Sequence, residues 1–446
     1  MKLSELTAIS PLDGRYRNKI EELSSYFSEY ALIKYRLVME VNYLKGLARL
    51  RIPPLDKFPD NAYKQLDTIA ADFDIKAAKR IKSLEKTTNH DVKAVEYYLK
   101  EQFSKVGLTR YQEFIHFALT SQDINNTAIP LSLKDAHKQA ILPQIKQLIT
   151  VLKKLSRQWK NIPMLAHTHG QPASPTRLGK EIEVFANRLE LQLNDLNKIP
   201  FAAKFGGATG NFNAHLVAYP DVDWERFADR LLKSVGLHRS KPTTQIEHYD
   251  YLAAYLDNLK RINTILIDFS QDMWLYISQN YFTQKIKKGE VGSSTMPHKV
   301  NPIDFENAEG NLGLSNAMCG HMANKLPISR LQRDLTDSTI LRNLGTAVGY
   351  SLLGVSSLLK GCGKLKLNKD ALNRDLDENW AVLGEAIQTV LRREGYPKPY
   401  EALKELTRNN QKISKDQLWV FIDNLKIEDT VKEDLKQLTP FNYTGI

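Results

Sequence analysis

The chain has 446 residues, of which 42% are hydrophobic, 25% charged and 9% aromatic, an ordinary globular composition that excludes a disordered or collagen-like chain. Its 62 basic and 51 acidic residues give a formal net charge of +11 but are interleaved, so we expect a solvated surface and small anionic partners rather than nucleic acid. No apolar run reaches the roughly 18 residues of a membrane span, and the first residues do not form a signal peptide. We therefore expect a cytoplasmic protein with no membrane partner.

Helical periodicity predominates along the sequence, and it predicts an all-α fold. We expect three domains. Residues 1–111 should form short helices broken by Pro53-Pro54 and Pro59, residues 112–364 a central bundle of long helices, and residues 365–446 a second group of short helices.

Three seams of apolar residues, spaced three and four residues apart, mark the long helices of the central domain. In chain order they are Ile141, Ile145, Leu148, Leu152 and Leu155; Leu252, Tyr255, Leu259, Ile262, Leu266, Phe269, Met273 and Tyr276; and Val348, Leu352, Val355 and Leu359. At least three long helices should therefore pack side by side. A helix of about 35 residues extends roughly 50 Å, which separates the loops at its two ends.

Three segments between these helices have the composition of loops, where function is expected. Residues 161–176 contain three prolines and a glycine, residues 205–210 are rich in glycine, and residues 283–302 are rich in Gly, Ser and Lys.

The strongest chemical signal is the string Gly292-Ser293-Ser294-Thr295-Met296-Pro297-His298-Lys299-Val300-Asn301-Pro302. Its hydroxyl groups, its backbone amides and its lysine can cradle an anion, and its flexible first half can close over a substrate. A fragment of it would be typical of any solvated turn, but the whole string resembles the GSSxMPxKxNP signature of the fumarase/aspartase superfamily. That resemblance implies a three-domain fold whose long-helix bundles assemble into a tetrameric helical core.

Further segments resemble one branch of that superfamily, the adenylosuccinate lyase family of bacterial type, in the same order and over essentially the whole chain. They are Asp13-Gly14-Arg15-Tyr16, Thr87-Thr88-Asn89-His90-Asp91-Val92-Lys93, Thr120-Ser121-Gln122-Asp123, Thr168-His169-Gly170-Gln171-Pro172, Thr243-Thr244-Gln245-Ile246-Glu247, Ile303-Asp304-Phe305-Glu306-Asn307 and residues 330–342. The resemblance implies a carbon–nitrogen lyase of purine biosynthesis. Its substrates are succinyl-AMP and the succinylated aminoimidazole carboxamide ribotide, from which it releases fumarate.

Such an elimination requires a base for a proton of the succinyl carbon, hydrogen-bond donors for the resulting aci-carboxylate, and an acid for the departing nitrogen. By resemblance, Ser293 is the base and His169 is the general acid, a role that suits the ordinary histidine pKa of about 6.5. Serine is a weak base, so we expect Lys299 and the loop amides to stabilise its alkoxide.

By resemblance, three further groups bind the substrate. The nucleotide end is bound by Arg15, Tyr16, Arg333, Ser338 and Arg342, because arginine meets phosphate bidentately. The succinyl end is bound by Thr120, Ser121, Gln245, Ser294, Lys299 and Asn301. The pocket is completed by Asn89, His90, Asp91 and Asn307. We also hypothesise that His90, beside Asp91, orients His169.

His167 and His169 form an HxH pair, but neither a HxxxH pair nor a Cys cluster accompanies it, so we expect no metal and no cofactor. Cys319 and Cys362 lie in apolar helical contexts and should be buried, reduced residues.

The sequence departs from the family pattern in two places. His167 stands where an arginine is expected, and His248-Tyr249 stands where Pro-His is expected, so no function is assigned to these residues. We also expect relatives to continue with a short helix beyond Ile446.

Candidate residues on loops at opposite ends of long helices could not all reach one substrate within one subunit. We therefore expect a homotetramer whose active sites each draw on three subunits. The alternatives are a fumarate-releasing lyase for argininosuccinate, aspartate or malate, a non-catalytic protein of the same fold, and a nucleic-acid-binding protein. His298 and the Thr-Thr-Asn-His-Asp segment argue against the first, and the presence of Ser293 and His169 argues against the second.

Overall fold

The computed structural model describes residues 4–285, 296, 299–407 and 413–446. This part of the chain is mostly helical, as the periodicity predicts, and has three two-stranded sheets. Within it, no helix combines the length and the hydropathy that crossing a membrane would require. The chain divides into two compact units: unit 1 comprises residues 1–146, 192–264 and 310–356, and unit 2 comprises residues 147–191, 265–309 and 357–446.

Unit 1 contains a group of helices from the first third of the chain and three helices from later segments. They are α1 (Arg17–Ile20), α2 (Ser24–Phe27), α3 (Glu29–Arg49), α4 (Asp60–Ala71), α5 (Ile75–Thr88), α6 (Asp91–Lys105), α7 (Ser121–Ala136), α10 (Asn213–Ala218), α11 (Trp224–Ser234) and α14 (Thr336–Leu341). The short strands β3 (Ala202–Ala203) and β4 (His238–Arg239) pair in parallel.

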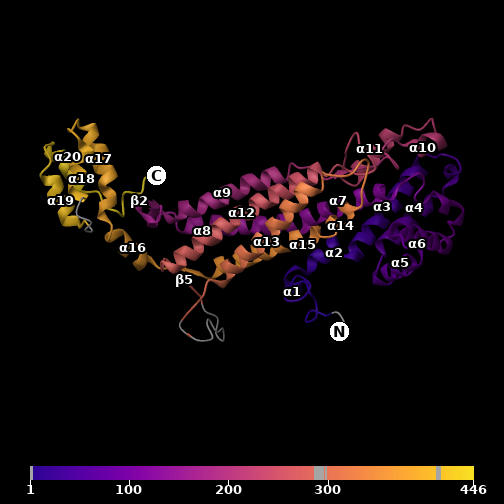
Figure 1. Ribbon diagram of the computed structural model, residues 1–446, viewed down its shortest axis with the longest axis horizontal. Coiled ribbons are helices and arrows are strands. Elements are labelled where there is room, and N and C mark those ends of the chain that lie inside the picture. The colour runs from indigo at the N-terminus through magenta and orange to yellow at the C-terminus, as the bar shows by residue number, and fades with distance from the viewer. Residues whose placement is uncertain (1–3, 286–295, 297–298, 408–412) are drawn as a thin grey trace. The chain divides into compact units, whose positions relative to one another are not determined.

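The main core of unit 1 forms around α3. Leu37, Leu44 and Leu47 recur at helical spacing on its buried face and are at most 1% exposed. They belong to one apolar cluster with side chains of α4, α5, α6, α7 and α11, and Figure 1 shows α3 to α6 gathered together. The expected break at Pro53-Pro54 and Pro59 falls in the connection between α3 and α4, because proline cannot continue a helix.

Unit 2 contains the strands β1 (Pro163–Thr168), β2 (Gln171–Arg177), β5 (Phe282–Gln284) and β6 (Leu365–Leu367), and β1–β2 and β5–β6 pair antiparallel. Its last segment forms α16 (Lys369–Asp377), α17 (Gly384–Arg393), α18 (Pro399–Thr407), α19 (Lys415–Asp423) and α20 (Asp429–Lys436). Ile387, Leu391 and Ile422 are at most 1% exposed and centre a separate apolar cluster there.

Five long helices contribute residues to both units: α8 (Leu142–Gln158), α9 (Leu178–Leu196), α12 (Asp250–Ser278), α13 (Ile303–Lys325) and α15 (Leu344–Lys364). The expected seams fall on α8, α12 and α15, except that Ile141 of the first seam lies in the π-helical segment His137–Ile141 just before α8. Leu148, Leu266 and Val355 in these seams are fully buried. Both cysteines, on α13 and α15, are free and buried, as predicted.

Residues 161–176, expected to be a loop, instead form most of the β1–β2 hairpin. The hairpin turns on two residues, His169 and Gly170, with φ of 54° and 73°, the left-handed pair that a tight hairpin turn requires. The prolines that suggested a loop are tolerated because both strands of a two-stranded ribbon are edge strands.

Candidate functional site

A cavity of about 710 Å³ in unit 1 gathers side chains from α2, α3, α7, the α5–α6 junction and the segment around α14. Its volume lies in the range of small-molecule sites, roughly 300–1,000 Å³. It is lined by seven of the residues proposed from the sequence: Asn89, His90, Asp91, Ser121, Arg333, Ser338 and Arg342. Residues more than 200 positions apart in sequence are thus brought to one cavity.

The junction between α5 and α6 presents Asn89, His90 and Asp91 to the cavity. Asn89 ends α5 with φ of 50°, a left-handed conformation that asparagine tolerates well. His90 then caps α6: its Nδ1 accepts a hydrogen bond from the Lys93 amide at 3.1 Å. In neutral His90, an accepting Nδ1 leaves the proton on Nε2, which lies 3.4 Å from the Ser121 hydroxyl.

Ser121 is held at the cavity by the start of α7. Thr120 is the N-cap, and the Asp123 carboxylate accepts a hydrogen bond from the Thr120 amide at 2.8 Å, one half of a capping box. Thr120 itself is not among the residues that line the cavity.

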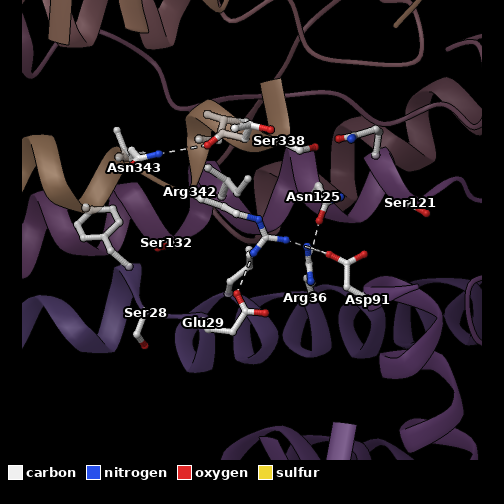
Figure 2. A pocket seen from close by; sticks show the side chains of 18 of the residues that line it. Ser28, Glu29, Arg36, Asp91, Ser121, Asn125, Ser132, Ser338, Arg342 and Asn343 are labelled. Carbon is white, nitrogen blue, oxygen red and sulfur yellow. Dashed lines mark hydrogen bonds and ion pairs between the residues drawn. The ribbon is translucent and has the colours of Figure 1, made fainter. Parts of the chain in front are cut away.

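Asp91 faces two arginines, Arg36 and Arg342 (Figure 2). Its Oδ2 accepts hydrogen bonds from Arg36 at 2.7 Å and from Arg342 at 3.4 Å, and Arg342 also donates to Glu29 at 2.8 Å. Burial alone would raise the pKa of the Asp91 carboxyl, but the neighbouring Arg36 guanidinium and the hydrogen bonds lower it below its ordinary value. Asp91 is therefore an anion that fixes two guanidinium groups.

Arg36 is the buried member of this set, at 3% exposure, and its Nε donates to Asn125 Oδ1 at 2.8 Å. Arg333, another lining residue, is held by two amides. Its Nη1 donates to Gln245 at 3.3 Å, and, in the amide orientation that pairs donors with acceptors, the Gln122 oxygen accepts from Nη2 at 2.6 Å and from Nε at 3.3 Å.

A fully buried ion pair joins the loop after β3 to Asp123 on α7. Lys204 Nζ lies 2.7 Å from Asp123 Oδ1, and both side chains are 0% exposed. The same carboxylate oxygen accepts hydrogen bonds from the amides of Gly206 at 2.9 Å and Gly207 at 3.1 Å. Gln245 joins this loop by donating to the Ala208 carbonyl at 3.1 Å. The loop 205–210 predicted from glycine content therefore has a defined conformation.

The other candidate residues lie elsewhere. Arg15 and Tyr16 precede α1 in unit 1 and are not among the residues lining the cavity. His169, Lys299, Asn301 and Asn307 belong to unit 2, and Ser293, Ser294 and His298 lie outside the described residues. His169 is exposed at the hairpin turn, whereas Asn307 accepts a hydrogen bond from Ser357 at 2.8 Å. In the described ranges, no three His, Cys, Asp or Glu residues come together as metal ligands would.

Sequence reasoning assigned no function to many of the lining residues, among them Glu29, Arg36, Gln122 and Asn125. Asn125 lies one helical turn beyond Ser121, so the helical spacing of α7 could have identified it. Gln122 follows Ser121 directly, and helical spacing does not point to it. Arg36 is buried on α3 among mostly apolar side chains, and a charge among buried apolar positions is a recognisable signal. Glu29 carries no such signal.

Comparison with known proteins places the chain in a family. The family model described as lyase matches residues 14–318, and the model described as adenylosuccinate lyase C-terminal matches residues 329–444. The chain is 56% identical to adenylosuccinate lyase of Dictyostelium discoideum and 53% identical to that of Escherichia coli, in each case over 100% of this chain and 98% of the relative.

Solved structures of lower identity share the fold. The chain matches a fumarate lyase from Mesorhizobium sp. BNC1 with a TM-score of 0.74 at 18% identity over 95% of both chains. It matches the 3-carboxy-cis,cis-muconate lactonizing enzyme of Pseudomonas putida with a TM-score of 0.73 at 20% identity over 95% of this chain and 94% of that one. The expected helical fold of the fumarase/aspartase superfamily is thus confirmed, and the chain belongs to the adenylosuccinate lyase family.

Proposed function

We propose that this member of the adenylosuccinate lyase family, an enzyme of purine biosynthesis, releases fumarate from succinyl-AMP to give AMP. It would also release fumarate from the succinylated aminoimidazole carboxamide ribotide to give the carboxamide ribotide. The observation that carries this proposal is the unit 1 cavity, in which Arg36, Arg333 and Arg342 lie among hydroxyl and amide side chains. Such a lining suits a ligand with one phosphate and two carboxylates, because arginine pairs with both kinds of anion.

In this proposal Arg333, Ser338 and Arg342 bind the nucleotide end, together with Arg15 and Tyr16. Arg342 and Arg333 are pre-oriented by hydrogen bonds to other residues. Glu29 and Asp91 hold Arg342, and Gln122 and Gln245 hold Arg333. Held side chains lose less conformational freedom when the substrate binds.

The succinyl end is assigned to hydroxyl, amide and amine donors: Thr120, Ser121, Gln245, Ser294, Lys299 and Asn301. Asn89, His90, Asp91 and Asn307 complete the pocket. These donors would stabilise the negative charge that develops on the carboxylate next to the deprotonated carbon. The stabilisation is largest where the donors are fixed before the substrate arrives, as Ser121 is by the start of α7.

By resemblance to the superfamily, we assign Ser293 as the base and His169 as the acid. Ser293 removes a proton from the succinyl carbon, giving the aci-carboxylate. The electron pair left by the broken carbon–hydrogen bond then forms the fumarate double bond as the carbon–nitrogen bond breaks. His169 protonates the departing nitrogen, so that a neutral amine leaves. The exposed hairpin turn suits His169, since a residue at the tip of a two-residue turn projects beyond both strands. The reaction calls for no metal ion or cofactor.

We further propose a cytoplasmic homotetramer with active sites shared between three subunits. The support is the length of α12: its 29 residues extend roughly 43 Å, and Gln245 precedes it in sequence whereas Ser293 follows it. Helical bundles packed with dihedral symmetry can bring such segments of different subunits to one site.

The reaction and the two assignments are tested by following the ultraviolet absorbance of succinyl-AMP mixed with the wild type, with His169→Asn and with Ser293→Ala. Asparagine is favoured before glycine in this hairpin turn, so His169→Asn removes the imidazole and keeps the turn. We expect wild-type turnover and a loss of about 10²- to 10⁴-fold in kcat for His169→Asn. A wild type that leaves succinyl-AMP intact, or that cleaves argininosuccinate instead, contradicts the proposal.

A further inference from the structure

Tyr249, which departs from the family pattern, lies in a buried polar network next to the cavity. It is 4% exposed, has φ of 63°, and immediately precedes α12. Its backbone amide donates to the carboxylate of Glu247. Tyr249 does not line the cavity, so its contacts must explain why a polar side chain is buried there.

The Tyr249 hydroxyl connects two elements of unit 1. It donates a hydrogen bond to Asp337 Oδ2 at 2.8 Å and accepts one from Asn126 Nδ2 at 2.7 Å. Asn126 is on α7, and its own oxygen accepts from the Glu247 amide at 2.9 Å. Burial, with the Asp337 charge adding to it, raises the pKa of Tyr249 far above its ordinary value. The hydroxyl therefore remains a donor throughout the neutral range.

Asp337 extends this connection to the cavity wall. It is 6% exposed and is the second residue of α14. Its other oxygen, Oδ1, accepts from the Ser338 amide at 2.7 Å and from the Ser338 hydroxyl at 3.3 Å. Ser338 lines the cavity, and α14 lies in sequence between Arg333 and Arg342. A path of hydrogen bonds thus runs from α7 through Tyr249 and Asp337 to Ser338.

We propose that Tyr249 is a positioning residue for substrate binding: through Asp337 it fixes Ser338 and α14, and with α14 the two arginines that flank it. This inference rests on the proposed function of the cavity, because it concerns the residues assigned to the nucleotide end. Tyr249 itself touches no substrate. The competing explanation is a hydrogen bond that stabilises the fold and has no effect on binding.

Tyr249→Phe removes the hydroxyl and keeps the ring, and Tyr111→Phe is the matched control. Tyr111 is 6% exposed, and its hydroxyl donates to the Lys57 carbonyl at 2.6 Å in the core around α3, outside the cavity lining. Tyr249→Phe loses two buried hydrogen bonds and Tyr111→Phe loses one, so the thermal unfolding temperature should fall in both variants. Only Tyr249→Phe should change binding.

The measurements are KM and kcat with succinyl-AMP and the Kd of AMP by calorimetry. For Tyr249→Phe we expect KM and the Kd of AMP to rise about tenfold, the equivalent of one buried hydrogen bond, with kcat changed less than about threefold. Tyr111→Phe should keep wild-type values of all three. Wild-type KM and Kd for Tyr249→Phe, or equal changes in both variants, would overturn the proposal.

A double-mutant cycle with Asp337→Asn tests the path. If Tyr249 acts through Asp337, the effects of the two substitutions on the Kd of AMP are not additive, whereas additive effects contradict this path. The wild type separates this inference from the proposed function. A wild type that neither binds AMP nor cleaves succinyl-AMP refutes the function of the cavity, and an active wild type with an unaffected Tyr249→Phe refutes the positioning by Tyr249 alone.

Discussion

At the scale of the single residue, the two ring nitrogens of His90 have different contacts. Its Nδ1 caps α6, and its Nε2 lies near Ser121 in the cavity. Asparagine is a good N-cap and alanine is a poor one. His90→Asn should therefore keep the stability of the wild type, whereas His90→Ala should lose about 0.5–2 kcal/mol in denaturant unfolding.

Kinetics of the same two variants test whether the imidazole acts in the reaction. If His90 orients His169 or the substrate, both variants lose kcat to a similar extent, because neither has the ring. His90→Gln should behave in the same way. Wild-type kinetics in His90→Asn or His90→Gln would mean that His90 acts only as the N-cap of α6.

At this scale the sequence predicts the candidate site by motif and not by geometry. The resemblance identified seven residues that line one cavity, although their catalytic and binding assignments remain predictions. It could not identify Arg36, whose importance arises from α3 lying against Asp91 and Asn125. The charge among apolar residues of α3 marks Arg36 as unusual, but no local pattern shows that it contacts Asp91, 55 positions away in the sequence.

At the scale of the element, sequence periodicity predicts helices well and hairpins poorly. The seams identify α8, α12 and α15 because each helix buries a continuous apolar stripe. The β1–β2 hairpin escapes prediction because its prolines and its register shift near Met164 interrupt any two-residue alternation. The division into three domains at residues 111 and 364 stays a prediction.

An ion pair fastens α3 to the segment before α7 and should make stability depend on pH. His116 Nδ1 lies 2.6 Å from Glu40 Oε1, and Glu40 is 1% exposed. Burial alone would lower the pKa of His116, but the Glu40 carboxylate raises it above its ordinary value. A raised pKa means that protonated His116 favours the folded state, so this contribution is complete below about pH 6.5 and is lost as pH rises through the folded pKa.

Comparing thermal unfolding of the wild type and His116→Gln across this range tests the pair. The difference in stability should be largest near pH 6, about 1–3 kcal/mol for a hydrogen bond to a charged group, and should shrink by pH 9. A difference that is constant with pH would mean that His116 stabilises the fold without its charge.

At the scale of the whole molecule, the proposed sharing of sites predicts complementation between inactive variants. Arg342→Ala removes a group of unit 1, and His169→Asn removes a group of unit 2. If each site takes these groups from different subunits, random mixed tetramers contain some intact sites, about a quarter of all sites at equal mixing. Refolding the two variants together should therefore restore activity.

The control is each variant refolded alone. Sedimentation measures the molecular mass of the refolded protein in solution. Restored activity that appears only in the mixture, in a species of four chains, supports shared sites. Activity equal to the sum of the separate variants would mean that each chain builds its own site.

The buried Lys204–Asp123 pair has a consequence for how the protein opens. Glycine-rich loops usually exchange their amide hydrogens with solvent deuterium quickly, because nothing holds them closed. Here the amides of Gly206 and Gly207 donate to a carboxylate whose partner cation is wholly out of water, so exchange requires exposing an ion pair together with part of the core. Their protection should match that of core helices, and the loop would then unfold only when the surrounding unit does.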